Sequence, residues 1–403
     1  WLATDGGEGD PSDWSRPAID GESIAFLQYT SGSTGVPKGT MVTHGSLLAN
    51  LSQIERSVVN LQGDFHVVTW LPPYHDMGLI GFLLAPVYVG VSSTLMSPLE
   101  FLRRPETWLD AIASAPSPQV VSGGPDFAYD LVVRKVESAY RDRLDLSRWK
   151  VAFNGAEPIR ASTVRRFVDA FEASGFRPEA MAPCYGLAEA TLIVSGGLPG
   201  EAVQTARLDR EALTRGAVVP SEDDNAVELV GCGRIVPDLD VRIVDPERGE
   251  ELADGRVGEV WVRGDNVARG YWERAEATRE AFGLPLDRGN EAGPRFLRTG
   301  DLGFLREDEL FITGRLKDLV ILRGQNYYPT DIEAAAERTH PAVVPFGSAA
   351  FACEAEQGEV AVLVAELERR TGGDRRKKER AGPGRRSSSL PPAAVVPERV
   401  DPP

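Results

Sequence analysis

The pattern of hydrophobic and polar positions predicts alternating strands and helices through the first half of the chain. Short apolar runs predict strands at 23–29, 67–71, 93–96, 119–122 and 150–153. Helical periodicity predicts helices at 78–89, 105–113, 126–136 and 161–173, and one that Thr43 caps and that carries Leu47, Leu48, Leu51, Ile54 and Val58. Such alternation is typical of an α/β fold, in which helices cover both faces of a mostly parallel sheet.

After Gly197 the pattern changes to short strands at 228–230, 240–244 and 258–262, separated by Gly, Pro and Asp turns. This spacing predicts a small barrel or a distorted sheet attached to the main sheet. From about Asp318 a last piece carries a predicted helix at 331–338 and strands near 349–352 and 360–365. It is too short for a complete α+β domain.

These changes predict the domain boundaries. Residues 1–316 form a large N-terminal domain that lacks its first part and includes a β-rich subdomain at about 198–316. Residues 317–368 form a hinge and the start of a small, truncated C-terminal domain. Residues 369–403 are rich in Arg, Pro, Gly and Ser, so we interpret them as a disordered or out-of-frame tail. The alternative is a basic arm that binds an acidic surface.

Charge and composition exclude several classes of partner. The formal net charge of -16 argues against nucleic acid, which binds basic surfaces. No apolar run reaches the roughly 18 residues of a membrane-spanning helix. The three cysteines, Cys184, Cys232 and Cys353, make no CxxC pair, which argues against a disulfide framework or a zinc site. The chain is therefore predicted to be a cytoplasmic protein.

The loop at residues 30–39, with the sequence TSGSTGVPKG, is the most informative segment. Its glycines allow backbone N–H groups to approach an anion, its hydroxyls add donors, and Lys38 adds a positive charge. It follows a predicted strand and precedes a predicted helix, a common place for phosphate sites. The spacing is not that of a Walker A loop. The alternative is a flexible Ser/Gly loop without a ligand.

The segment YTSGSTGVPKG resembles the nucleotide-binding signature of the adenylate-forming superfamily, which includes acyl-CoA synthetases, luciferases and peptide-synthetase adenylation domains. Other motifs of that superfamily follow in order: LPPYHDMG at 71–78, FNGAEP at 153–158, CYGLAEAT at 184–191, RTGDLG at 298–303 and GRLKDLVILRGQNYYPTDIE at 314–333. The resemblance implies attack of a carboxylate on the α-phosphorus of ATP, which gives an acyl-adenylate and pyrophosphate. It also implies ATP and Mg2+ as cofactors.

At the phosphate end of the site, the resemblance assigns the β- and γ-phosphates to Lys38 and to the loop residues Thr30, Ser31, Gly32, Ser33, Thr34 and Gly35. Glu189 matches the family's magnesium ligand, a hard oxygen donor suited to that ion. Taken alone, Glu189 could equally be a helix-start glutamate stabilised by the helix dipole. His75 matches the residue beside the carboxylate at the mouth of the acyl tunnel, and we assign it no proton-transfer role.

At the nucleoside end, Asp301 would accept hydrogen bonds from both ribose hydroxyls and Arg315 would donate to the same sugar. Tyr185 would lie against the adenine, next to Gly186. The opposite wall and its surroundings are assigned to Asn154, Gly155, Ala156 and Glu157. The alternatives are a turn residue for Asp301 and ordinary core packing for Tyr185.

Within the superfamily, the stretches WLPPYHDMGLIG, LMSPLEFLRRPETWLDAI, SGGPDFAYDL and PCYGLAEATLIVSGG resemble fatty acyl-AMP ligases. That resemblance implies a long-chain fatty acid as substrate and an acyl carrier protein as acceptor. It also implies that residues 196–229 hold an insertion that restrains the small domain; the alternative is a polar surface loop. Candidates for the wall of the acyl tunnel are Met77, Leu79, Ile80, Phe82, Leu83 and Phe127, although a buried helix would carry the same residue types.

Lys317 matches the family's hinge, about which the small domain pivots. The family's catalytic lysine lies in a later Gly-Lys motif, and Lys377 and Lys378 lack the expected Ser-Gly before them. The leading function is therefore a fatty acyl-AMP ligase whose turnover in this chain is an open question. The alternatives are an acyl-CoA synthetase and a catalytically impaired nucleotide-binding fragment.

Overall fold

The computed structural model of the chain describes residues 12, 15–30, 37–57, 59, 61, 63–286, 293–322, 325–355 and 358–368.

Parallel strands form one half of the main sheet. The parallel strands lie in the order β7, β6, β5, β3, β4. Their bounds are β3 His66–Thr69, β4 Ser92–Leu95, β5 Val120–Gly124, β6 Trp149–Asn154 and β7 Met181–Gly186. The predicted alternation of strands and helices is confirmed here.

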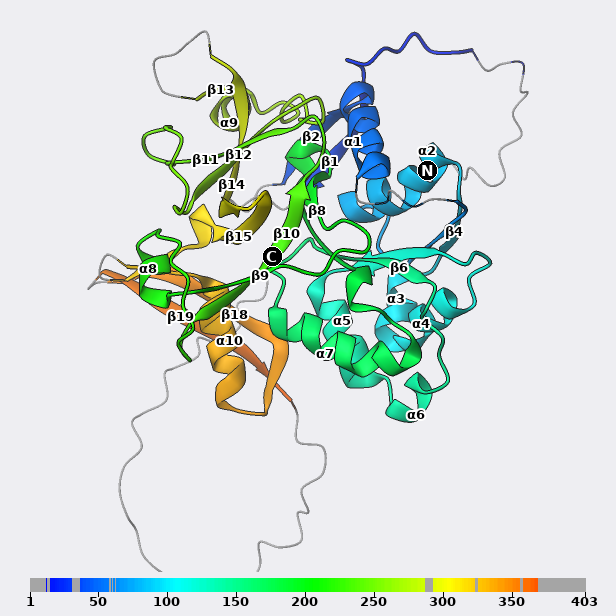
Figure 1. The fold of residues 1–403 in the computed structure, drawn as a ribbon. Helices are drawn as coiled ribbons and strands as arrows, with labels where there is room; N and C mark the ends of the chain where they lie inside the picture. Colours follow the sequence, from blue (N-terminus) through cyan, green and yellow to red (C-terminus); the bar gives the residue numbers. More distant parts are fainter. Residues whose placement is uncertain are drawn as a thin grey trace, which may run out of the picture.

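Helices lie on both sides of these strands. Figure 1 shows α1 and α2 above β6 and α5 and α7 below it. The helices of this half are α1 His44–Arg56, α2 Ala85–Val89, α3 Pro98–Arg103, α4 Glu106–Ala113, α5 Asp126–Lys135, α6 Ser138–Arg141 and α7 Ala161–Phe171. Shorter helical turns are η2 Met77–Leu84, which is a π-helix, and η3 Glu172–Ser174, η4 Pro178–Ala180 and η5 Ala188–Ala190. No helix in the described residues has the length and apolar character needed to cross a membrane.

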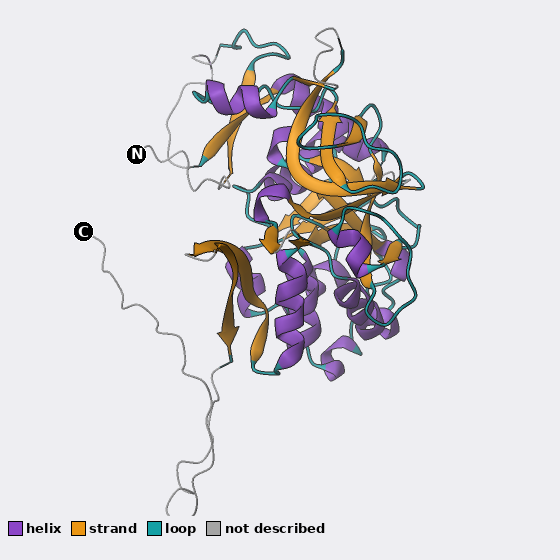
Figure 2. Cartoon of the chain, turned by 90° about the vertical axis from the view of Figure 1, so that its left-hand side faces the viewer, coloured by secondary structure: helices purple, strands orange, loops and turns teal. Residues whose placement is uncertain are grey.

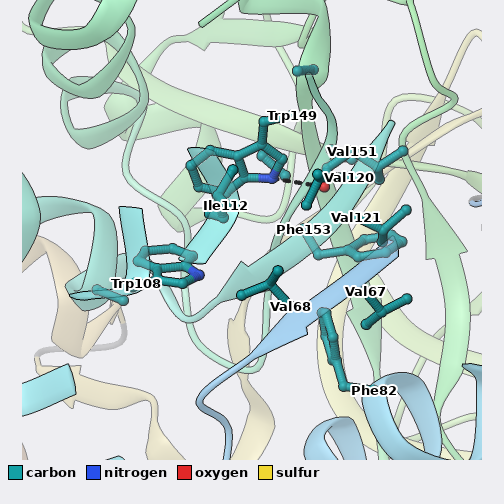
Figure 3. Packing of buried hydrophobic residues seen from close by; sticks show 14 of the residues in the cluster. Val67, Val68, Phe82, Trp108, Ile112, Val120, Val121, Trp149, Val151 and Phe153 are labelled. Carbon is teal, nitrogen blue, oxygen red and sulfur yellow. Dashed lines mark hydrogen bonds between the residues drawn. The ribbon is translucent and has the colours of Figure 1, made fainter. Parts of the chain in front are cut away.

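Large aromatic side chains fill the space between the parallel strands and the helices (Figure 3). Trp108 and Trp149 are almost fully buried, with ring centroids 5.2 Å apart. Each indole N–H has a partner: Trp108 donates to Ser122 Oγ at 2.8 Å and Trp149 donates to the Val151 carbonyl at 2.9 Å. Satisfying these donors avoids the cost of an unpaired polar group in the core.

Antiparallel strands continue the same sheet. The order runs from β7 through β8, β10, β15, β14 and β12 to β11, with β9 paired to β10 and β13 to β14. Their bounds are β8 Ile193–Gly196, β9 Thr205–Leu208, β10 Val227–Ile235, β11 Asp240–Val244, β12 Gly258–Arg263, β13 Leu284–Pro285, β14 Arg295–Arg306 and β15 Glu309–Arg315. Two short helices accompany them, α8 Arg210–Thr214 and α9 Ala275–Ala281. Figure 2 shows the strong curvature of these strands, as expected for a distorted sheet.

The glycine-rich loop joins two strands of a hairpin, β1 Ile24–Thr30 and β2 Lys38–Thr43, in which Thr30 pairs with Lys38. The sequence predicted a strand before the loop and a helix directly after it, so the second strand is a correction. Residues 38–43 were not recognised as a strand because Lys38 and Gly39 belong to the glycine-rich motif and neither residue type favours a strand. Besides β1, this strand contacts a distant segment, since Met41 N donates to the Gly270 carbonyl at 2.8 Å. The predicted Thr43 cap is confirmed, since its side chain accepts from Ser46 N at 3.1 Å.

The last described residues form a smaller group of elements. They are η6 Leu316–Asp318, β16 Val320–Leu322, β17 Gln325–Tyr327, α10 Pro329–Thr339, β18 Val343–Ala355 and β19 Gly358–Leu367. Figure 1 shows α10 beside the β18–β19 hairpin at the lower edge of the molecule. Two ion pairs join α10 to the larger body: Arg160 with Glu337 at 2.6 Å and Arg210 with Asp331 at 3.1 Å.

Candidate active site

A pocket of about 950 Å³ opens where the end of β7 meets the β1–β2 hairpin and β14. It combines charged, hydroxyl and apolar side chains. The predicted site residues that line it are Thr30, Lys38, His75, Ala156, Tyr185, Gly186, Glu189, Asp301, Arg315 and Lys317. The predicted loop residues Ser31, Gly32, Ser33, Thr34 and Gly35 lie outside the described residues. The structure therefore brings most of the described candidates to one cavity.

Asp301 is the centre of the polar end of the pocket. The Tyr185 hydroxyl donates to its Oδ2 at 2.7 Å, and Arg315 Nε lies 3.2 Å from its Oδ1. Burial raises the pKa of Asp301, while the Arg315 charge and the Tyr185 hydrogen bond oppose that rise. A carboxylate held in this way between two elements is a fixed acceptor for hydroxyl groups of a ligand.

A tight turn after β6 forms the wall near Tyr185. Ala156 lines the pocket and has a φ of 68°, in the left-handed region. Gly155 does not reach the pocket because it packs against β7, where a Cβ would lie 2.6 Å from Cys184 Sγ. The absence of a side chain at Gly155 therefore lets the turn approach β7 closely.

Two further predicted residues of this wall point away from the pocket. Asn154 is fully buried and donates from Nδ2 to Asp126 Oδ1 at 2.8 Å. Glu157 Oε1 accepts from the Phe127 backbone at 2.6 Å. Asp126 also accepts from the Arg160 backbone at 3.2 Å, so the start of α5 braces both ends of the turn. These residues support the wall and do not contact the cavity.

Burial changes the titration of the two carboxyl groups beneath this wall. It raises the pKa of Asp126 to about 6, against the hydrogen bond from Asn154. It also raises the pKa of Glu157 to about 7, against the Phe127 hydrogen bond. Asp126 could not be recognised from the sequence, because an aspartate that follows a proline at a helix start is an ordinary feature of helices.

At the other polar end of the pocket, Lys38 and Glu189 lie on either side of Tyr271. Lys38 Nζ lies 4.8 Å from the centre of the Tyr271 ring, and the Tyr271 hydroxyl donates to Glu189 Oε1 at 2.7 Å. Tyr271 could not be recognised as a site residue from the sequence either. Its neighbours Gly270 and Trp272 gave no sign of a site, because an aromatic residue beside a glycine is equally typical of a core.

Glu189 offers a single carboxylate to a metal ion. The described residues hold no cluster of three or more His, Cys, Asp or Glu side chains that would bind a metal by themselves. Mg2+ is commonly held by one or two carboxylates together with phosphate oxygens and water. The donor set therefore fits a magnesium ion that arrives with a phosphate ligand.

Apolar residues also line the pocket, and we call the following group its apolar arm: Met77, Gly81, Phe82, Phe153, Leu192 and Ile193. Of the candidates predicted for an acyl tunnel, Met77 and Phe82 lie here, whereas Leu79, Ile80, Leu83 and Phe127 do not line the pocket. Ile80 is fully buried in the core, which is the alternative that the sequence left open. The apolar arm and the polar ends belong to one cavity.

His75 lines the pocket next to Met77. Its Nδ1 lies 2.7 Å from Asp76 Oδ1, and this hydrogen bond raises the pKa of His75. About half of the His75 side chain is exposed, 52%. The ring therefore sits at an accessible edge of the cavity, beside its apolar arm.

Residues 196–229 contact the small group of elements at the end of the described chain. They include β9 and α8, and the Arg210 side chain of α8 pairs with Asp331 of α10. Lys317 lies in η6 and lines the pocket. The segment that the sequence marked as an insertion is thus in position to hold α10.

Comparison with known proteins identifies the family. Residues 3–272 match the family model of the AMP-binding enzymes. The chain is 43% identical over 360 residues to the medium-chain-fatty-acid–[acyl-carrier-protein] ligase JamA of Moorena producens, across 88% of this chain and 60% of that protein. It is 40% identical over 342 residues to the corresponding ligase TtuA of Teredinibacter turnerae, across 83% of this chain and 53% of that protein.

A solved structure shows the same fold. It is the crystal structure of a fatty acyl-adenylate ligase from L. pneumophila in complex with acyl adenylate and pyrophosphate, with a TM-score of 0.74 and 43% identity over 90% of this chain and 63% of that chain. The chain belongs to the AMP-binding enzyme family, and the predicted adenylate-forming fold and its likeness to fatty acyl-AMP ligases are confirmed. It spans 60% and 53% of the lengths of the two ligases above.

Proposed function

We propose that this protein joins a fatty acid to AMP. One carboxylate oxygen of the acid forms a bond to the α-phosphorus of ATP, and the bond from that phosphorus to the β-phosphate oxygen breaks. The electron pair leaves with pyrophosphate, and the product is an acyl-adenylate. One observation carries the proposal: the carboxylate residue Asp301, the cationic residue Lys38 and the apolar residues around Gly81 all line a single cavity.

The nucleoside would be held at the Asp301 end. Asp301 would accept from the two ribose hydroxyls, Arg315 would donate to the same sugar, and Tyr185 would lie against the adenine opposite Ala156. The polar contacts already made by Asp301 support this role, because they hold its carboxylate before a ligand binds. Preorganised groups of this kind lower the cost of ordering a bound ligand.

The triphosphate would extend toward Lys38, Glu189 and the loop that joins β1 to β2. Thr30 and Lys38 line the cavity at the two ends of that loop, which supports a phosphate-binding role for the residues between them. When bound, Mg2+ would supply positive charge between the phosphates, with Glu189 as its protein ligand. Lys38 would offset the charge of the β- and γ-phosphates, so that an anionic carboxylate can approach.

The fatty acid would lie with its chain in the apolar arm and its carboxylate near His75. The raised pKa of His75 supports an attractive role toward a carboxylate. The two ligases JamA and TtuA are described as acting on medium-chain acids, whereas the resemblance in sequence implies long-chain acids. We propose a fatty acid as the substrate class.

The second step would pass the acyl group to the phosphopantetheine thiol of an acyl carrier protein, in the cytoplasm. The thiol sulfur would attack the acyl carbon and AMP would leave. This part of the proposal rests on the ligases JamA and TtuA. We further propose that residues 1–316 act as the large domain and that the elements after Lys317 pivot against it. The Arg210–Asp331 pair supports a restraining role for residues 196–229.

The test is to incubate the protein with ATP, Mg2+ and octanoate, dodecanoate or palmitate, and to detect the acyl-adenylate by mass spectrometry. Carrier protein or coenzyme A is then added as acceptor. Acyl-adenylate followed by an acylated carrier protein supports the proposal. Acyl-CoA as the main product would identify an acyl-CoA synthetase, and ATP binding without any adenylate would identify a nucleotide-binding fragment. Either result contradicts the proposal.

A further inference from the structure

Tyr271 contacts the two charged groups at the phosphate end of the pocket. Its hydroxyl donates to Glu189 Oε1 at 2.7 Å. Its ring lies beneath Lys38, with Nζ 4.8 Å from the ring centre, a distance suited to a cation–π contact. One side chain thus links a carboxylate and an ammonium group that lie far apart in the sequence.

The backbone around Tyr271 holds it in place from two sides. The Met41 N–H donates to the Gly270 carbonyl and the Trp272 N–H donates to the Gly39 carbonyl, each at 2.8 Å, so residues 270–272 pair with β2. The Ala268 N–H donates to the Glu189 carbonyl at 2.9 Å, which ties the same segment to η5. Tyr271 therefore sits at a junction between the strand of Lys38 and the turn of Glu189.

The Tyr271 hydroxyl acts as a hydrogen-bond donor to Glu189. A carboxylate oxygen accepts, so the Tyr271 phenol O–H is the donor in its hydrogen bond with Glu189. Its hydrogen bond engages Oε1 of Glu189, a residue that lines the pocket, and no hydrogen bond or ion pair to Oε2 is found among the described residues. A side chain that hydrogen-bonds a metal ligand fixes the orientation of that ligand and commonly changes metal affinity by about 10- to 100-fold.

We propose that Tyr271 is a positioning residue, whose hydroxyl orients Glu189 toward a phosphate-bound magnesium ion and whose ring orients Lys38 toward the phosphates. This inference rests on the proposed function, because it takes the pocket to bind ATP. Tyr271 itself touches neither the reacting carboxylate nor the α-phosphorus in this account.

The test measures ATP binding by titration, with Mg2+ and with EDTA, and involves no turnover. Tyr271→Phe removes the hydroxyl and keeps the ring. We expect the Mg2+-dependent part of ATP affinity to fall about tenfold, while ATP affinity in EDTA stays at the wild-type value. Tyr271→Leu removes both contacts, so its ATP affinity should also fall in EDTA.

The matched control is Tyr140→Phe, which removes a tyrosine hydroxyl that donates to Asp110 at 2.6 Å on the exposed surface. It should leave both affinities unchanged. A second pair of variants tests whether Tyr271 acts through Glu189: in a Glu189→Gln background, Tyr271→Phe should have no further effect on Mg2+ dependence.

The possible results distinguish a failure of this inference from a failure of the proposed function. Wild-type protein that binds no ATP contradicts the proposed function. Wild-type ATP binding that Mg2+ does not change contradicts the role given to Glu189. If Tyr271→Phe keeps the full effect of Mg2+, or if its effect adds to that of Glu189→Gln, Tyr271 is a structural residue and the inference is wrong.

Discussion

The Tyr185 hydroxyl donates a hydrogen bond to the Asp301 carboxylate over 2.7 Å, and so joins the end of β7 to β14 across the pocket. The parallel and antiparallel halves of the sheet meet at this place. Asp301 is only 6% exposed, and its other oxygen faces Arg315. The nucleoside end of the proposed site therefore exists as a fixed arrangement before any ligand binds.

We predict that Asp301→Ala and Lys38→Ala affect different parts of the nucleotide. Asp301→Ala should weaken ATP and AMP binding alike, by about 1.5–3 kcal/mol or roughly 10- to 150-fold, because both ligands carry the ribose. Lys38→Ala should weaken ATP binding and leave AMP binding near wild type, since AMP has no β- or γ-phosphate. Titrations with both nucleotides check this. Equal losses for both nucleotides in Lys38→Ala would contradict the orientation proposed here.

We predict that Arg315 sets the acid limit of nucleoside binding. Asp301 must be ionised to accept two hydroxyl donors, and its pKa is raised by burial but held down by Arg315. Arg315→Gln should raise that pKa further. On acidification, the affinity for the nucleoside should therefore begin to fall at a higher pH in this variant than in the wild type. Arg315→Lys keeps the positive charge, so the acid limit of its nucleoside binding should stay near that of the wild type. Adenosine is the suitable ligand, because it has the ribose hydroxyls but no titrating phosphate. Identical acid limits in all three proteins would disprove this.

We predict that Glu157 lowers stability as the pH rises. Its folded-state pKa of about 7 lies above the ordinary value of 4.5, so the native state holds a proton that the unfolded state loses. The contribution of Glu157 to the free energy of unfolding should therefore be fully present below the ordinary value, and about 3 kcal/mol should be lost as the pH rises through the folded value. Glu157→Gln cannot ionise and should lack this loss, while Asp126 titrates in both proteins. Urea unfolding of the wild type and of Glu157→Gln, measured between the ordinary and the folded-state pKa, compares the two proteins. Parallel curves of unfolding free energy against pH would refute the prediction.

We predict that Arg160 and Glu337 fasten α10 to the larger body. Their side chains are 23% and 12% exposed, and the Arg160 guanidinium also lies 3.9 Å from the centre of the Phe346 ring. A double-mutant cycle with alanine should give a coupling of about 1–2 kcal/mol, more than an exposed pair. Arg165 and Glu228 form such a pair, at 57% and 28% exposure, and serve as the control. The rate of hydrogen exchange in β18 should rise in the Arg160 and Glu337 variants and stay unchanged in the Arg165 and Glu228 variants. Equal coupling energies in the two double-mutant cycles would contradict the fastening role.

Much of the candidate site could be predicted because its motifs fix residue types at positions that the fold brings together. Tyr185, Glu189, Asp301 and Arg315 all line the predicted pocket. The direction of a side chain within a tight turn could not be predicted. The left-handed turn at Ala156 leads Glu157 toward α5, although both residues belong to one motif.

The remaining differences arise from contacts between distant segments. Strand β2 pairs not only with β1 but also with residues 270–272, and the Tyr271 side chain contacts Lys38 and Glu189, which are distant in the sequence. Local periodicity carries no information on such pairs. It also could not show that Phe82 lines the pocket whereas Ile80 does not, because both are buried residues of one short helix.

The central claim is that one cavity holds a nucleotide and an acyl chain at the same time. Its most direct test is the affinity for a non-hydrolysable acyl-adenylate analogue, such as dodecanoyl-sulfamoyl adenosine, compared with AMP. The analogue should bind at least about 100-fold more tightly than AMP, because both ends are engaged together.

Two variants assign the ends of that analogue. Asp301→Ala should weaken both ligands, whereas Gly81→Leu should weaken only the analogue, because even a Cβ at Gly81 would lie 3.2 Å from Leu192 in the apolar arm. Gly81→Ala is the milder matched change and should lose less. We expect Asp301→Ala to weaken both ligands and Gly81→Leu to weaken the analogue alone. An analogue that binds no better than AMP, with an affinity that Gly81→Leu leaves unchanged, would contradict it.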